Sequence, residues 1–155
     1  GMLQRFGIAQ AVLGNPQIII ADEPTAGLDP EERNRFLNLL SEIGENIIVI
    51  LSTHIVQDVR DLCSSMAILN AGEIILQGNP SELTQTLSGR IWSKVVAKEE
   101  IPNYKSAFRV LSTKLFSGKT QIQILAENQP ESGFENIKPD LESLYFSSLL
   151  HPVSS

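Results

Sequence analysis

The chain has 155 residues, of which 42% are hydrophobic and 19% charged, and its formal net charge is −6. This length is enough to bury one substantial core, or a modest core with a small appendage. The acidic balance argues against nucleic acid or an anionic membrane surface as the main partner, because both require clustered Lys and Arg. The single cysteine, Cys63, cannot form an internal disulfide, so we expect a reducing, cytosolic setting.

The N-terminal part alternates between helical and strand-like segments. Apolar spacing predicts a helix from Gln4 to Gly14. The β-branched run at 17–22 has no polar alternation, which predicts a strand buried on both faces, as in a parallel sheet covered by helices. A turn at 23–28 follows, and Asp29 begins the next helix, because Pro30 suits the first helical position.

The same alternation continues to about residue 87. We predict a second buried strand at 47–51 and a helix from Ile55 to Cys63. Two strand-like runs, 66–69 and 73–77, are separated by an Asn-Ala-Gly sequence that favours a hairpin. Asn79-Pro80 then opens a short helix that reaches Leu87.

The character of the sequence changes near Ser88. Later strand-like segments lack the same continuous hydrophobicity; they lie at 91–97, 108–116 and 121–125. A turn at 117–119 joins two of them, and apolar spacing from Leu141 to Leu149 predicts a closing helix. We therefore predict an α/β fold for residues 1–88, with a parallel sheet and flanking helices, and a small α+β domain over 89–155.

The strongest chemical signal is one ordered string of residues. Ile-Ile-Ile-Ala-Asp-Glu-Pro-Thr-Ala-Gly-Leu-Asp-Pro fills positions 18–30, and Ser-Thr-His fills 52–54. This string resembles the ABC ATPase family, whose fold is that of a P-loop NTPase. A carboxylate at the end of a buried strand is held rigidly at the edge of the sheet, where ligands bind in open α/β folds. Phosphoryl transfer requires a carboxylate for Mg²⁺ and a group that orients the attacking water, and Asp22 and Glu23 suit those roles.

The resemblance implies a role for each residue of the string. Asp22 would hold Mg²⁺ through water, and Glu23 would be the general base or water-orienting carboxylate. His54 would be the switch histidine that reaches the γ-phosphate of ATP. Asp29 would be the D-loop aspartate, which contacts the opposite subunit and belongs to the nucleotide-binding residues. Simpler interpretations exist: an isolated Asp-Glu pair is often merely solvated, a lone histidine often packs or caps, and a plain N-cap explains Asp29 completely.

The opening residues, Gly1 to Arg5, resemble the end of the family's signature motif. In that case Gly1 would be the last signature glycine, at a helix N-terminus that suits the γ-phosphate of an ATP bound by the partner. A residue left by an expression tag, ahead of an initiating Met2, explains Gly1 equally well.

No phosphate-binding P-loop, Gly-x-x-x-x-Gly-Lys-Ser/Thr, occurs in the sequence. The nearest imitation, at 117–120, lacks the upstream glycine and is interpreted as a hairpin. Without a P-loop, no nest of N–H groups or lysine holds the β and γ phosphates. We therefore expect this chain alone not to hydrolyse ATP.

The resemblance covers residues 1 to about 87, and 52–58 and 70–78 match ATP-binding subunits of bacterial exporters. Asp58 stands where a glutamate is common. From Arg90 onward the chain resembles an accessory tail of such subunits. The resemblance implies an ATPase subunit of an exporter, using ATP and Mg²⁺, that pairs with a second ATPase subunit and with transmembrane permease subunits at the inner face of the membrane.

Two other functions are compatible with the sequence. The chain could be a truncated interaction module with inherited remnants of the ATPase residues. A soluble ABC ATPase of translation or DNA repair fits less well, because those proteins commonly carry paired nucleotide domains or long insertions.

Overall fold

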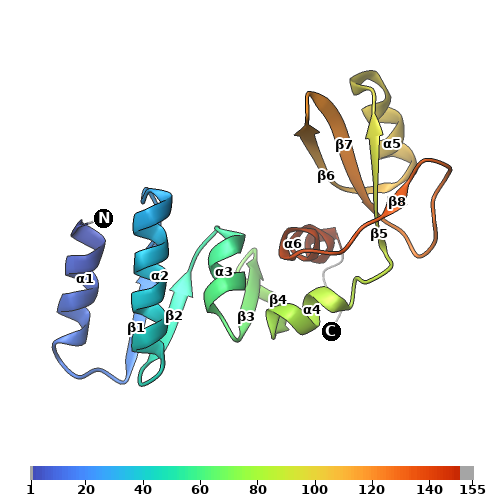
Figure 1. Ribbon diagram of the computed structural model, residues 1–155. Helices are drawn as coiled ribbons and strands as arrows, with labels where there is room; N and C mark the ends of the chain where they lie inside the picture. The colour runs from blue at the N-terminus through green and yellow to red at the C-terminus, as the bar shows by residue number, and fades with distance from the viewer. Residues whose placement is uncertain (1, 151–155) are drawn as a thin grey trace. The chain divides into compact units, whose positions relative to one another are not determined.

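The computed structural model describes residues 2–150 (Figure 1). The chain divides into two compact units, one up to Cys63 and one from Ser64 onward. The first unit combines helices with a parallel strand pair, and the second combines helices with antiparallel strands. The predicted α/β class, followed by an α+β part, is confirmed. The domain boundary placed at residue 88 stays a prediction.

The first unit follows the predicted order of helices and strands. Its elements are α1 (Met2–Val12), β1 (Ile18–Asp22), α2 (Pro30–Gly44), β2 (Ile48–Ser52) and α3 (Val56–Leu62). β1 and β2 pair in parallel, with Ile18 opposite Ile48 and Asp22 opposite Ser52. The core gathers Ile8 of α1, Ile19 of β1, and Phe36 and Leu40 of α2. Helix α2 contributes Phe36 and Leu40 together because residues four apart lie on one helix face.

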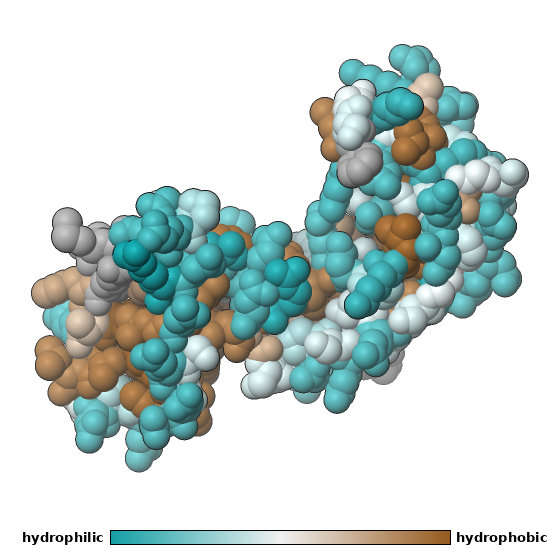
Figure 2. Space-filling view, in the orientation of Figure 1, coloured by the Kyte–Doolittle hydropathy of each residue, from teal (hydrophilic) through white to brown (hydrophobic). Residues whose placement is uncertain are grey.

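The prediction that both strands are buried on both faces is wrong. Successive side chains of a strand point to opposite faces of the sheet, and the core covers only the face that carries Ile19. The other face is exposed, and Ile20 keeps 75% of its surface accessible; its other members are Ile18, Ile48 and Ile50. Figure 2 shows hydrophobic side chains gathered over this N-terminal part of the molecule. We call these four isoleucines the open face.

The second unit has a hairpin, a four-stranded sheet and three short α-helices. Its elements are β3 (Met66–Asn70), β4 (Glu73–Gly78), α4 (Pro80–Gln85), β5 (Ile91–Val96), a 3-10 turn (Lys98–Glu100), α5 (Ile101–Ala107), β6 (Arg109–Phe116), β7 (Lys119–Leu125), β8 (Glu135–Asn136) and α6 (Leu141–Leu150). The predicted hairpin is confirmed as β3–β4, and the sheet order is β6-β7-β5-β8. Three elements were not predicted from the sequence: α5, β8 and the 3-10 turn.

An aromatic cluster holds the loop before β8 in the second unit. Phe134 is buried and makes edge contacts with Tyr104 and Phe108. The Lys94 ammonium lies 5.3 Å from the ring centroids of Tyr104 and Phe134 and donates to Glu131 Oε1 at 2.6 Å. The hydrogen bond between the two groups favours their charged forms, and the Tyr104 hydroxyl bonds to both, so the pKa of Lys94 is raised and that of Glu131 is lowered.

Within residues 2–150, no helix has the length and apolar character needed to cross a membrane.

The open face predicts self-association of this chain. Burying apolar surface contributes about 25 cal/mol per Å², and a sheet face this apolar has no cover within the first unit. We expect concentration-dependent association in sedimentation velocity, and the double variant Ile20→Lys with Ile48→Lys should shift the distribution to the monomer. Leu115→Lys, which changes an exposed leucine of the second unit, is the matched control and should not. Monomeric behaviour of the unmodified chain at high concentration would contradict this prediction.

Candidate functional site

β1 and β2 bring the predicted catalytic segments to one edge of the sheet. Asp22, the last residue of β1, lies opposite Ser52, the last residue of β2, and the Ser52 hydroxyl donates a hydrogen bond to Asp22 Oδ1. The side chain of Asp22 is exposed. Because parallel strands end at a common edge, the residues after each strand start from neighbouring positions. Glu23 and His54 therefore emerge close together.

Glu23 and His54 are in direct contact. Glu23 Oε1 accepts a hydrogen bond from the His54 backbone N–H at 3.0 Å and lies 2.7 Å from His54 Nδ1. An ionised carboxylate only accepts hydrogen bonds, so Nδ1 carries the proton in this contact. Sequence reasoning expected both residues at this edge, and the structure places them there.

The backbone of Glu23 has an unusual conformation. Its φ is 45°, in the left-handed region that residues other than glycine seldom adopt. Such a residue costs on the order of 1–3 kcal/mol and persists only where its surroundings fix it. The Glu23 N–H donates to Ser52 O at 2.9 Å, and Ala26 N–H donates to Glu23 O at 3.1 Å. Backbone hydrogen bonds on both sides thus hold the strained residue.

The second carboxylate oxygen of Glu23 has no partner. Oε2 is buried and accepts no hydrogen bond from any residue in the described part of the chain. A buried polar atom left unpaired costs about 1–3 kcal/mol. A ligand or water that supplies a donor at this atom would recover that cost.

The acidic residues suit Mg²⁺ only together with ligands from elsewhere. Residues 2–150 contain no cluster of three or more His, Cys, Asp or Glu side chains able to hold a metal. Mg²⁺ is commonly bound through one or two carboxylates, several waters and the phosphates of a nucleotide. An exposed carboxylate such as Asp22 fits that arrangement.

Asp29 caps helix α2. Its Oδ1 accepts a hydrogen bond from the Glu32 N–H at 2.8 Å, and Pro30 occupies the first turn. These contacts satisfy the simpler interpretation of Asp29, and its assignment to a nucleotide stays a prediction. Gly1, the other residue predicted to contact nucleotide, lies outside the described residues.

The structure also contains a buried polar network that sequence reasoning missed. Asp58 is 1% exposed; its Oδ2 accepts from the Thr25 hydroxyl, and its Oδ1 accepts from Arg33 Nε at 2.7 Å. A signal was available, because Asp58 occupies the i+3 position of the apolar stripe that begins at Ile55 and continues at Val59. A charged residue in an apolar stripe predicts a buried, paired carboxylate.

Cys63, at the end of α3, is a poor nucleophile. Burial raises the pKa of its thiol, and the neighbouring charge of Asp58 raises it further. Because the thiolate is the reactive form, this cysteine is not a catalytic candidate.

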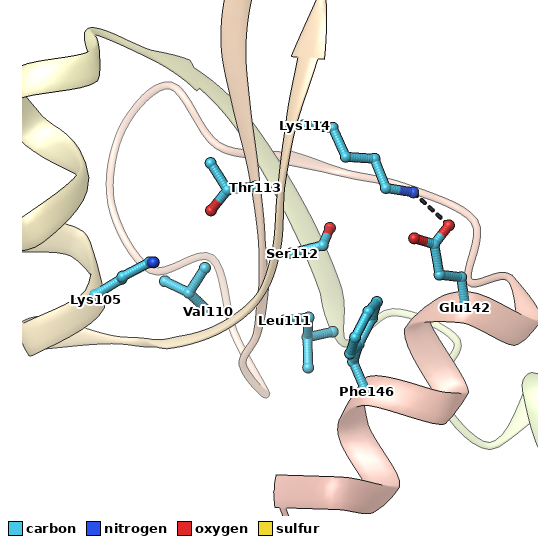
Figure 3. Close-up of a pocket in the computed structure, with 8 residues that line it drawn as sticks. All are labelled: Lys105, Val110, Leu111, Ser112, Thr113, Lys114, Glu142 and Phe146. Atoms are coloured by element: carbon cyan, nitrogen blue, oxygen red, sulfur yellow. Dashed lines mark hydrogen bonds and ion pairs between the residues drawn. The ribbon is translucent and has the colours of Figure 1, made fainter.

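A cavity of about 360 Å³ lies in the second unit, beside β6 and α6 (Figure 3). It is lined by Lys105, Val110, Leu111, Ser112, Thr113, Lys114, Glu142 and Phe146. Lys114 extends toward Glu142 and forms an ion pair with it (Figure 3). None of the predicted site residues lines this cavity.

No family model matches the chain, but individual proteins do. YxlF of Bacillus subtilis (strain 168), an uncharacterized ABC transporter ATP-binding protein, is 32% identical over 78% of this chain and 41% of its own length. YbhF of Escherichia coli (strain K12), a probable multidrug ABC transporter ATP-binding protein, is 30% identical over 96% of this chain and 28% of its own length. Methionine import ATP-binding protein MetN 2 of Oceanobacillus iheyensis is 33% identical over 81% of this chain and 40% of its own length.

The chain is homologous to ABC transporter ATP-binding proteins. It spans less than half the length of these ABC relatives. Among solved structures, cbiO1 from Clostridium perfringens, part of the ABC transporter complex cbiONQ, is 38% identical, with a TM-score of 0.48, over 51% of this chain and 32% of that one.

The capping contact of Asp29 predicts a stability effect. Asp29→Ala removes the acceptor of the Glu32 N–H, and loss of such an N-cap costs about 1 kcal/mol. Urea unfolding, followed by circular dichroism, should show this loss. Asp29→Asn keeps a capping oxygen and is the matched control, with most of the stability retained. Equal stability of Asp29→Ala and the unmodified chain would contradict the capping role.

Proposed function

We propose that this chain is part of an ATP-binding subunit of an ABC-type exporter and contributes residues that act on the γ-phosphate of ATP. The observation that carries the proposal is the contact between Glu23 Oε1 and His54 Nδ1, beside a buried Glu23 Oε2 without a partner. In this proposal residues 1–88 belong to the ATP-binding domain and 89–155 form an accessory domain.

Each polar group at the sheet edge has a distinct task in the proposal. Asp22 would hold Mg²⁺ through water, and the ion would supply positive charge beside the phosphates when it is bound. Glu23 orients the attacking water and accepts its proton. His54 donates a hydrogen bond to an oxygen of the γ-phosphate, and Asp29 contacts the opposite subunit.

The Glu23–His54 contact sets a condition on this chemistry. Oε1 already accepts from two groups of His54, and Oε2 is enclosed. A neutral imidazole that donates through Nδ1 has only an acceptor at Nε2, so it cannot also donate to a phosphate. In the proposal, therefore, either His54 is cationic when it meets the phosphate, or it leaves Glu23 and frees Oε1 for the water.

The open face agrees with a larger ATP-binding domain. Parallel sheets are normally covered on both faces, whereas Ile18, Ile20, Ile48 and Ile50 are exposed. The curated relatives are more than twice as long as the region they share with this chain. In the proposal, further ATP-binding polypeptide that carries a P-loop covers this face, a second ATPase subunit completes the nucleotide site, and permease subunits hold the assembly at the inner membrane surface.

The proposal predicts that the chain alone has no steady ATPase activity, because it contains no P-loop sequence. Phosphate release from Mg-ATP should equal the background rate for both the chain and its Glu23→Gln variant. Turnover by the chain that Glu23→Gln abolishes would overturn this part of the proposal.

A chimera tests the catalytic assignment. This chain replaces the aligned region of MetN 2, with which it shares 33% identity over 141 residues. We expect Mg-ATP hydrolysis, which Glu23→Gln lowers by about 10²- to 10⁴-fold in kcat because a general base is lost, while nucleotide binding persists. A rate unchanged by Glu23→Gln would contradict the role of Glu23. A chimera that folds and binds Mg-ATP without hydrolysing it would instead favour the interaction module.

A further inference from the structure

Thr25, Arg33 and Asp58 form one buried network, which we call the Asp58 network. Thr25 is 2% exposed and Asp58 is 1% exposed. The Thr25 hydroxyl donates to Asp58 Oδ2, whereas Arg33 Nε donates to Oδ1 at 2.7 Å and Arg33 Nη2 lies 2.5 Å from the same oxygen. Both carboxylate oxygens are therefore paired.

Such a network is an unusual way to stabilise a small unit. A buried carboxylate loses its hydration, and its attraction to a buried partner often fails to repay that loss. An apolar residue at the i+3 position of the α3 stripe would pack against the core without this penalty. The network is better explained by the positions it imposes than by the free energy it contributes.

The network fixes the chain segments that carry the two catalytic candidates, Glu23 and His54. Thr25 lies two residues after Glu23, in the turn that leaves β1, and Asp58 lies four residues after His54, in α3. Arg33 ties the same carboxylate to the first turns of α2. The network thus connects the segment that carries Glu23 with the segment that carries His54, through side chains other than those of the pair.

Glu23 requires such support. Its left-handed backbone, with φ at 45°, is strained, and the strain is maintained only if the following turn is fixed. The Thr25 side chain anchors that turn from inside the unit, while Leu28 N–H donates to Thr25 O at 3.2 Å.

We infer that Asp58 is a positioning residue that, by holding Thr25 and Arg33, fixes Glu23 in contact with His54. The catalytic meaning of this inference rests on the proposed function. The contact itself is measured without nucleotide, so failure of the inference and failure of the proposed function are distinguishable.

The experiment records the imidazole resonances of His54 by NMR in the full chain at one pH. The chain has only two histidines, His54 and His151, so a His151→Gln variant gives the assignment. Glu23→Ala supplies the reference spectrum for a lost contact. Thr25→Val removes the hydroxyl while keeping the shape of the side chain, and Thr25→Ser, which keeps a hydroxyl, is the matched control.

We expect the His54 resonances of Thr25→Val to move most of the way to those of Glu23→Ala, whereas Thr25→Ser restores the original values. Backbone amide resonances of α1, remote in sequence from the network, report whether the unit remains folded. His54 resonances that stay at their original values in a folded Thr25→Val protein would overturn the inference and leave the network a stability role only. If Thr25→Val does not fold, Thr25→Ala decides, because it also removes the hydroxyl that donates to Asp58 and places no methyl group at the position of the lost oxygen. The same two outcomes then apply.

Discussion

The parallel, in-register pairing of β1 with β2 is the constraint on which the rest of the first unit depends. It sets Asp22 opposite Ser52, and so determines where Glu23 and His54 leave the sheet. Any slip of one residue would turn Ile19 from the core to the open face, because strand side chains alternate. Core packing and site geometry are therefore fixed by the same register.

Polar groups in this unit serve geometry more than stability. Glu23 has a strained backbone and a buried oxygen without a partner, and Asp58 has a desolvated carboxylate. Each feature costs free energy that a packed apolar side chain would not cost. Their concentration behind one sheet edge distinguishes this edge from the cavity beside β6, where Lys114 and Glu142 form a half-exposed ion pair.

The sequence allowed prediction of local structure more reliably than of burial. The run at 17–22, the N-cap at Asp29 and the β3–β4 hairpin depend on residues close in the chain, and the structure contains all of them. Exposure of Ile20 depends on what covers a sheet face, which no local pattern contains. Helix α5 was missed because its short segment has a proline and an asparagine in the first turn and no long apolar stripe. The Thr25–Asp58 contact joins distant segments, and only the position of Asp58 in the stripe hinted at it.

Cys63 gives the chain a natural reporter of motion at the end of α3. Its side chain is half-buried, and burial together with the charge of Asp58 raises the pKa of its thiol. Because the thiolate is the reactive form, alkylation of this residue is slowed while α3 is packed in the unit and becomes faster when α3 opens locally. Asp58 lies in the same helix. The labelling rate of Cys63 therefore reports how firmly the helix that carries Asp58 is packed, and no cysteine has to be introduced for the measurement.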